Sequence, residues 1–312
     1  MGQVDLATKN FFGKKDIFAD LMNNYFFQGR KVIQAKDLVD RDTESVLANF
    51  KPGKLKSKYR DLFKQVEIKA DKRATYVLIG IENQTEVDYT MPIRVLLYDA
   101  LAYEHQRVEA VALYKEAKDS FTNGRRFFNG LPQGTLFKPV ITMVIYLGSG
   151  CWAGPRSLYD SLDRDIPQEF SRYVNNWQVP IIEPSKLSNR DLAGYATELG
   201  LVMKFLKYCH DKAKLLEEIR KDAGFTNVSG EALGVMNSVS RFQLRPLATT
   251  EEGGYNMCKA IDDLIKDSVA EGRAEQARET AVTLKNMGMA VDVIAKAVHV
   301  KEDVVKEWLA CI

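Results

Sequence analysis

Two uninterrupted apolar segments constrain the fold of this chain most. Residues 75–82, TYVLIGIE, and residues 139–148, PVITMVIYLG, combine β-branched and aromatic side chains with almost no polar alternation. Segments of this length and composition are typical of strands that are buried on both faces of a sheet. Such strands need helices on either side, so the sequence predicts a sheet covered by helices, in an α/β or an α+β arrangement.

Weaker patterns supply the rest of the sheet and its cover. Residues 61–69 alternate imperfectly between apolar and polar side chains and predict a half-exposed strand. The segment VPIIEP at 179–184 predicts a short strand that ends at a proline. Apolar residues at helical spacing predict helices over 16–27, 92–107 and 190–222. We therefore expect one domain over residues 1–222.

The C-terminal part of the chain differs in character. Residues 223–254 contain scattered Gly and Ser, and we interpret them as a linker. Residues 255–312 predict a helical extension, in which two short helices over 291–297 and 301–309 are compatible with a helix-turn-helix motif. The second of these helices has more acidic than basic side chains, whereas a DNA-reading helix is normally more basic or rich in amides. We therefore expect the extension to pack or to form a homo-oligomer, with DNA binding left open.

Composition excludes several classes of protein. The chain has 312 residues, of which 46% are hydrophobic and 28% charged, as is ordinary for a globular protein. No apolar segment approaches the roughly 20 residues of a transmembrane helix, and the first residues lack the apolar core of a secretory signal. The four cysteines have no metal-ligand spacing and fit free thiols in a reducing compartment. We therefore expect a cytoplasmic protein with no membrane partner.

An acid ends the more hydrophobic of the central strands. Glu82 follows YVLIGI directly, and burial of a carboxylate is costly unless a cation or solvent compensates its charge. Gln84 shares the face of Glu82 because side chains alternate along a strand, and Asp61 begins the preceding strand. If the two strands are neighbours, Asp61 and Glu82 converge on an oxygen-rich site that suits Mg²⁺ or Mn²⁺. The alternative is an ordinary acid at a strand end, with Asp61 capping a turn.

A basic segment precedes these strands. Residues 51–60, KPGKLKSKYR, contain no acid, and their basic side chains are Lys51, Lys54, Lys56, Lys58 and Arg60. Most runs of this kind are solvated loops. The net charge of the whole chain is only +2, which disfavours a coat for unspecific nucleic-acid binding.

Several motifs occur together in one order and with compatible spacing. They are Asp61 before the first core strand, Glu82 and Gln84 at the end of the second, Met91, Arg94 and Tyr98 on the following helix, and Tyr146, Gly148 and Trp152 after the next strand. Through these motifs, residues 18–184 resemble the Rpn family of recombination-promoting nucleases, which are transposase-related members of the PD-(D/E)XK superfamily. The resemblance implies an α/β, restriction-endonuclease-like mixed sheet flanked by helices, with a C-terminal helical extension.

The resemblance also implies an activity. It predicts a metal-dependent DNA endonuclease that hydrolyses phosphodiester bonds in recombination or transposition, with Mg²⁺ or Mn²⁺ held by Asp61 and Glu82. Gln84 would position water or phosphate beside them. The residues that would contact DNA are Lys54, Lys56, Lys58, Arg60 and Arg94. The alternative for Arg94 is an ion pair with Asp99 or Glu104.

Two departures from the family pattern bear on the activity. Asn83 stands where many members have His, and Gln84 stands where the general PD-(D/E)XK signature has Lys. A side-chain amide does not titrate near neutral pH, so Gln84 is no general base. A second interpretation is therefore a non-catalytic relative that keeps the fold and binds nucleic acid or protein. A third is a nuclease that acts on RNA, as in toxin or defence systems.

Overall fold

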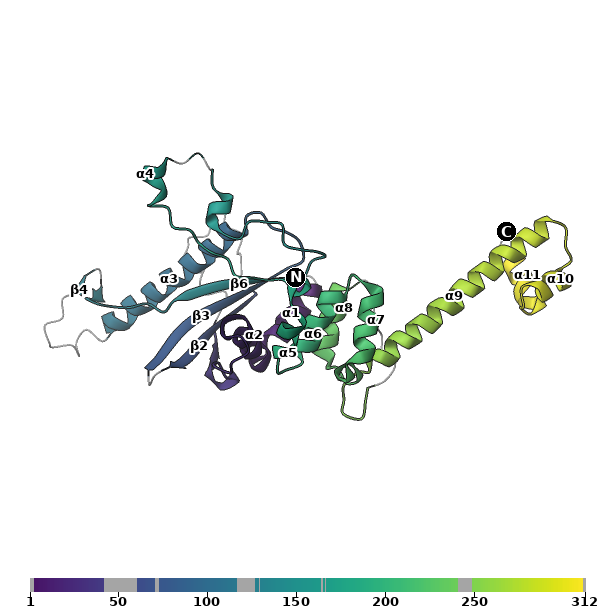
Figure 1. The fold of residues 1–312 in the computed structure, drawn as a ribbon, viewed down its shortest axis with the longest axis horizontal. Coiled ribbons are helices and arrows are strands. Elements are labelled where there is room, and N and C mark those ends of the chain that lie inside the picture. Colours follow the sequence, from purple (N-terminus) through teal and green to yellow (C-terminus); the bar gives the residue numbers. More distant parts are fainter. Residues whose placement is uncertain are drawn as a thin grey trace. The chain divides into compact units, whose positions relative to one another are not determined.

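The chain forms two separately packed units. The computed structural model describes residues 3–41, 61–70, 73–116, 127–128, 130–163, 165, 167–240 and 249–310 (Figure 1). The first unit comprises Met1–Gly224 and Val228–Gln243, and the second comprises Phe225–Asn227 and Leu244–Ile312. Every helix among the described residues is too short or too polar to span a bilayer.

A mixed sheet forms the centre of the first unit. Its strands lie in the order β1 (Leu38–Asp40), β2 (Leu62–Ala70), β3 (Arg73–Gln84), β6 (Val140–Tyr146) and β7 (Ile181–Ile182). β1, β2 and β3 pair antiparallel, whereas β3, β6 and β7 pair parallel. The two apolar segments are thus neighbouring central strands, β3 and β6, which confirms the α/β fold with a mixed sheet. A separate hairpin consists of β4 (Phe127–Phe128) and β5 (Leu131–Pro132).

Helix α3 (Met91–Glu116) connects β3 to β6 and covers one face of the sheet (Figure 1). Met91 and Val95 of this helix pack against Val144 and Tyr146 of β6. The helix is longer than the predicted 92–107, because the residues that follow Arg107 are mostly good helix formers. Its first turn lies directly after the loop that leaves the end of β3, so α3 brings side chains to that end of the sheet.

Helix α2 (Lys15–Phe27) covers the other face of the sheet. Nζ of Lys64 in β2 lies 5.6 Å from the ring centroid of Phe18 in α2. The preceding residue of β2, Phe63, packs with Ala102 of α3 instead. Because adjacent side chains of a strand point to opposite faces, α2 and α3 lie on opposite sides of β2.

A helical layer completes the first unit. Helix α1 (Gln3–Gly13) packs against α8 (Gly230–Val239), which lies within the segment 223–254 that we predicted as a linker. The apolar residues of α8 have helical spacing, which the Gly and Ser residues around them obscure, and four of them are buried. The other helices of the region are α4 (Gln168–Ser171), α5 (Asn189–Gly194), α6 (Leu199–Tyr208) and α7 (Lys212–Lys221), with 3₁₀ turns at Ala35–Asp37, Leu158–Ser161, Pro184–Lys186 and Ala223–Thr226.

Gly148 lets the loop after β6 approach the end of β3. A Cβ at this position would overlap the carbonyl oxygen of Thr85 and lie 2.5 Å from the hydroxyl oxygen of Tyr146. We expect Gly148→Ala to lower the free energy of unfolding by about 1–3 kcal/mol, the usual cost of overpacking. Chemical denaturation measures this loss. Gly234→Ala in α8 is the control, because its Cβ would lie 3.9 Å from that of Ala7, and equal stability of both variants would contradict the packing argument.

The second unit consists of helices, as predicted for the C-terminal extension. They are α9 (Met257–Asn286), α10 (Val291–Ala297) and α11 (Glu302–Ala310). The buried side chains that join them are those of Ala281, Ile294, Ala295 and Val305. The turn between α10 and α11 contains His299 in the left-handed conformation, with φ of 55°. Two short helices therefore lie where the sequence predicted them, over 291–297 and 301–309.

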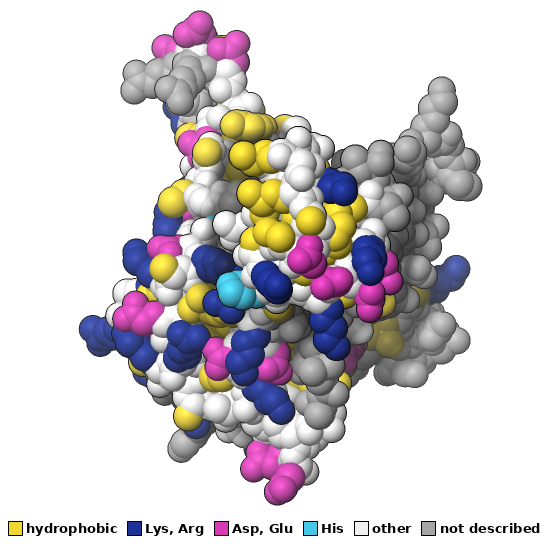
Figure 2. Space-filling model, turned by 90° about the vertical axis from the view of Figure 1, so that its right-hand side faces the viewer, with side chains coloured by type: hydrophobic (Ala, Val, Ile, Leu, Met, Phe, Trp, Pro, Cys, Tyr) yellow, Lys and Arg dark blue, Asp and Glu magenta, His cyan; other side chains and the backbone are white. Residues whose placement is uncertain are grey.

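The surface of the protein carries mixed charge on the face seen in Figure 2. Hydrophobic side chains gather in one area of this face, and basic and acidic side chains are interspersed around it. In the second unit, the exposed large apolar side chains include Val269, Met287, Met289 and Val293. A DNA-binding face is normally a basic patch rather than a mixture of both signs. The homo-oligomer through the C-terminal helices stays a prediction.

Candidate active site

The register of the central hairpin brings two acids to the same end of the sheet. Leu62 of β2 pairs with Ile81 of β3, and Asp61 and Glu82 are the next residues beyond this pair. Glu82 is buried, with 2% of its surface exposed. β2 and β3 are thus the neighbouring strands that the predicted site requires.

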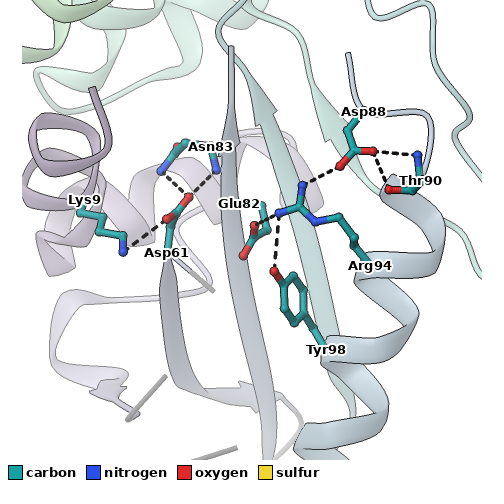
Figure 3. Close-up of polar contacts among 8 residues, drawn as sticks. All are labelled: Lys9, Asp61, Glu82, Asn83, Asp88, Thr90, Arg94 and Tyr98. Carbon is teal, nitrogen blue, oxygen red and sulfur yellow. Dashed lines mark hydrogen bonds and ion pairs between the residues drawn. The ribbon is translucent and has the colours of Figure 1, made fainter. Parts of the chain in front are cut away.

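The carboxylate of Asp61 is held from two sides (Figure 3). Its Oδ2 accepts the backbone N–H of Asn83 at 2.9 Å and the side-chain N–H of Asn83 at 3.5 Å. Its Oδ1 lies 3.4 Å from Nζ of Lys9, which belongs to α1. One oxygen of Asp61 is therefore held by β3, and the other pairs with the ammonium group of Lys9 from α1.

The carboxylate of Glu82 turns toward α3 (Figure 3). Its Oε2 accepts a hydrogen bond from Nη2 of Arg94 at 3.1 Å. Nη2 of Arg94 also lies 3.5 Å from the hydroxyl oxygen of Tyr98. Because Asp61 turns toward α1 and Glu82 toward α3, each acid has a basic partner from its own side of β3.

Asp88 anchors Arg94 at the start of α3. Its Oδ2 accepts a hydrogen bond from Nη1 of Arg94 at 2.6 Å. Its Oδ1 accepts the backbone N–H of Thr90 at 2.7 Å and the hydroxyl of Thr90 at 2.6 Å. The guanidinium of Arg94 is therefore bound through both terminal nitrogens, Nη1 by Asp88 and Nη2 by Glu82.

The cluster favours a charged Arg94, a charged Asp88 and a neutral Tyr98. Burial lowers the pKa of Arg94, but hydrogen bonds to Asp88 and Tyr98 outweigh this effect and raise that pKa above its ordinary value. Burial raises the pKa of Asp88, but hydrogen bonds from Thr90 and Arg94 outweigh it, so the pKa of Asp88 is lowered. Burial and then the charge of Glu82 raise the pKa of Tyr98.

Gln84 ends β3 on the same face as Glu82. Its register partner is Tyr146, which packs under α3. Its carbonyl oxygen accepts the backbone N–H of Leu147 at 2.7 Å, so the loop after β6 fixes the end of β3. Because side chains alternate along a strand, the amide of Gln84 lies on the α3 face beside Glu82.

The donor atoms at this end of the sheet fit a hard divalent cation. Asp61 and Glu82 offer carboxylate oxygens and Gln84 an amide oxygen, and Mg²⁺ prefers oxygen ligands. Oδ1 of Asn83 is buried and has no hydrogen-bond partner among the described residues, so an unsatisfied oxygen lies beside Asp61. Within the ranges that the structure describes, no cluster of three or more His, Cys, Asp or Glu could hold a metal. Two carboxylates are nevertheless a usual protein contribution for Mg²⁺, which substrate phosphates and water complete.

A family comparison covers this whole region. The family model described as "Putative transposase, YhgA-like" matches residues 4–227, which is more than two thirds of the chain. The chain belongs to this family. A search of curated proteins and a search of solved structures each found no match. Membership in the YhgA-like family confirms the resemblance drawn from the motifs and indicates a role in transposition that involves DNA.

The YhgA-like region extends further than the motifs indicated. It begins at residue 4, so it includes α1 and Lys9, whereas the motif-based resemblance begins at residue 18. No local pattern marks Lys9, because its pairing with Asp61 depends on the packing of α1. Asp88 is close to the site in sequence, where it could add a carboxylate or be an ordinary solvated acid, and the structure shows it binding Arg94. A signal for its local role exists, because an acid two residues before Thr90, at the start of a helix, is typical of a capping turn.

The side chains of this YhgA-like protein that were predicted to contact DNA fall into two groups. Lys54, Lys56, Lys58 and Arg60 lie outside the described residues. Arg94 lies at the site, and its alternative pairing with Asp99 or Glu104 is wrong, because residues five and ten positions along a helix point in other directions. Glu104 pairs with Arg107 at 2.7 Å instead.

Proposed function

We propose that this YhgA-like family member is a metal-dependent DNA endonuclease that hydrolyses phosphodiester bonds in recombination or transposition. The observation that supports it most is the pair of acids beyond the Leu62–Ile81 register, each beside a basic side chain. Asp61 and Glu82 would hold Mg²⁺ or Mn²⁺, an ion that stabilises charge on a reacting phosphate and lowers the pKa of water.

The neighbouring side chains suit work on a phosphodiester. Gln84 can donate its N–H to a phosphate oxygen or orient a water molecule through its carbonyl, without taking a proton. Arg94 can donate to a phosphate oxygen, and its buried Nε has no hydrogen-bond partner among the described residues. Asp88 keeps the guanidinium at this end of the sheet while Glu82 exchanges partners.

The DNA backbone would be contacted by the basic segment that precedes Asp61. Its predicted contacts are Lys54, Lys56, Lys58 and Arg60. Each phosphate that these side chains neutralise releases counterions, so DNA binding should weaken as salt rises. This basic segment directly precedes Asp61 in the sequence, so its proposed phosphate contacts and the first candidate metal ligand are sequence neighbours.

A direct assay compares supercoiled plasmid, single-stranded DNA and RNA, each with Mg²⁺, with Mn²⁺ and with EDTA. The proposal expects nicking of the plasmid with either ion and none in EDTA. Salt-dependent DNA binding without cleavage under any condition would contradict the proposal and favour the non-catalytic relative. Cleavage of RNA alone would contradict the DNA substrate and favour the third interpretation.

A further inference from the structure

Lys9 brings a positive charge to the candidate site from a distant part of the chain. Its Nζ lies 3.4 Å from Oδ1 of Asp61, and its side chain is 19% exposed. Charges that are shielded from solvent are screened less by salt than exposed ones. Lys9 therefore acts on Asp61 as a close cation, and a divalent ion would have to share that carboxylate with it.

The packing of α1 sets the position of Lys9. Phe11 and Phe12 are fully buried on this helix. Gly13 ends α1 against β2, where an added Cβ would lie 3.3 Å from Cδ2 of Leu62, the residue after Asp61. Lys9 is one turn before this close approach. Its contact with Asp61 thus follows from a well-packed helix and not from a loose surface side chain.

The formal charges of the cluster are balanced when both a divalent metal ion and a phosphodiester are bound. The charged side chains in it are Asp61, Glu82 and Asp88 on the acidic side, and Lys9 and Arg94 on the basic side. Three acids and two bases leave one net negative charge. A divalent cation would turn this into one net positive charge, which a single phosphodiester would neutralise.

We propose that Lys9 is a phosphate-binding residue of this site. It competes with the divalent cation for Asp61, and once the cation takes that carboxylate, Lys9 contacts a phosphate of the bound DNA. This inference rests on the proposed nuclease function. A lysine suits the exchange because its ammonium group is a point charge on a flexible stem of four carbons.

The first test measures metal binding without DNA. Mn²⁺ is titrated into the parent chain, Lys9→Met and Lys14→Met, with free Mn²⁺ followed by electron paramagnetic resonance. Lys9→Met removes the competing charge, so we expect its Mn²⁺ affinity to rise about fivefold, the scale of one partly exposed ion pair. Lys14→Met is the matched control, since Lys14 pairs with Glu231 at 3.2 Å and with no acid of the candidate site.

The second test measures the salt dependence of DNA binding. A labelled duplex is titrated by fluorescence anisotropy over a range of salt, once with Ca²⁺ and once with EDTA. With Ca²⁺, we expect the slope of log K against log salt to fall by about 0.9 in Lys9→Met, the change for one phosphate contact. In EDTA the slopes of parent and variant should agree, because Lys9 then stays on Asp61. Lys9→Arg should restore the parental slope with Ca²⁺.

The outcomes separate this inference from the proposed function. If the parent binds Mn²⁺ but Lys9→Met matches it in both affinity and slope, the role of Lys9 is overturned and the metal site stands. If the parent binds no Mn²⁺, the proposed function is overturned and this inference falls with it. Circular dichroism and thermal unfolding check that each variant folds, and Lys9→Arg provides a second variant that keeps the charge.

Discussion

Glu82→Gln is expected to reduce Mg²⁺-dependent nicking of supercoiled DNA about a thousandfold. The change keeps the shape of the side chain and an oxygen for Arg94, but removes the charge that would hold the metal. A metal ion supplies several kcal/mol of charge stabilisation to a transition state, and each 1.36 kcal/mol corresponds to about a tenfold change in rate. Initial rates of conversion from supercoiled to open-circular plasmid measure the loss.

The control for this experiment lies on α3. Glu104→Gln removes an acid that pairs with Arg107 on the surface of the same helix, so its nicking rate should equal that of the parent. Asp61→Asn should lose activity like Glu82→Gln. Equal nicking by the parent, Asp61→Asn and Glu82→Gln would reject both residues as parts of the active site.

Asp99→Ala is expected to destabilise the first unit by about 3 kcal/mol, since each buried donor that loses its acceptor costs about 1–3 kcal/mol. Asp99 is 1% exposed on α3. Its Oδ1 accepts the hydroxyl of Thr142 in β6 at 2.6 Å, and its Oδ2 accepts the indole N–H of Trp177 at 3.0 Å. The substitution leaves both donors without this acceptor and loosens α3 on the sheet.

Urea denaturation followed by tryptophan fluorescence measures this loss. Trp308 belongs to the second unit, so Trp308→Phe is introduced first and the remaining signal reports Trp152 and Trp177 of the first unit. Asp99→Asn is the matched variant, because its amide oxygen still accepts one of the two hydrogen bonds, and it should lose less stability than Asp99→Ala. If Asp99→Ala had the same free energy of unfolding as the parent, these hydrogen bonds would not be what holds α3 on the sheet.

The central strands and Glu82 could be predicted from the sequence because their signal is local. An apolar run of this length fits one strand and is too short for most helices, so a buried strand is the natural interpretation. An acid at the end of such a run is easy to detect in the sequence. The pairing of Leu62 with Ile81 belongs to the antiparallel register of two strands that only two residues separate in the sequence. The backbone positions of Asp61 and Glu82 were therefore within reach of sequence reasoning.

The partners of these acids could not be predicted in the same way. The pairing of Lys9 with Asp61 depends on how α1 packs against β2, and the pairing of Arg94 with Glu82 depends on how α3 crosses the sheet. These contacts arise from tertiary packing, which no short pattern encodes. Helix α8 shows the same limit, because isolated Gly and Ser residues around its apolar side chains favoured a linker.

The central claim is that Asp61 and Glu82 bind one divalent cation together. Crystals of the parent chain soaked in Mn²⁺, measured for anomalous scattering, test this claim most directly. The account predicts a single anomalous peak that is coordinated by an oxygen of each carboxylate, with Lys9 displaced from Asp61. A peak bound by only one of the two acids, or no peak at this end of the sheet, would contradict it.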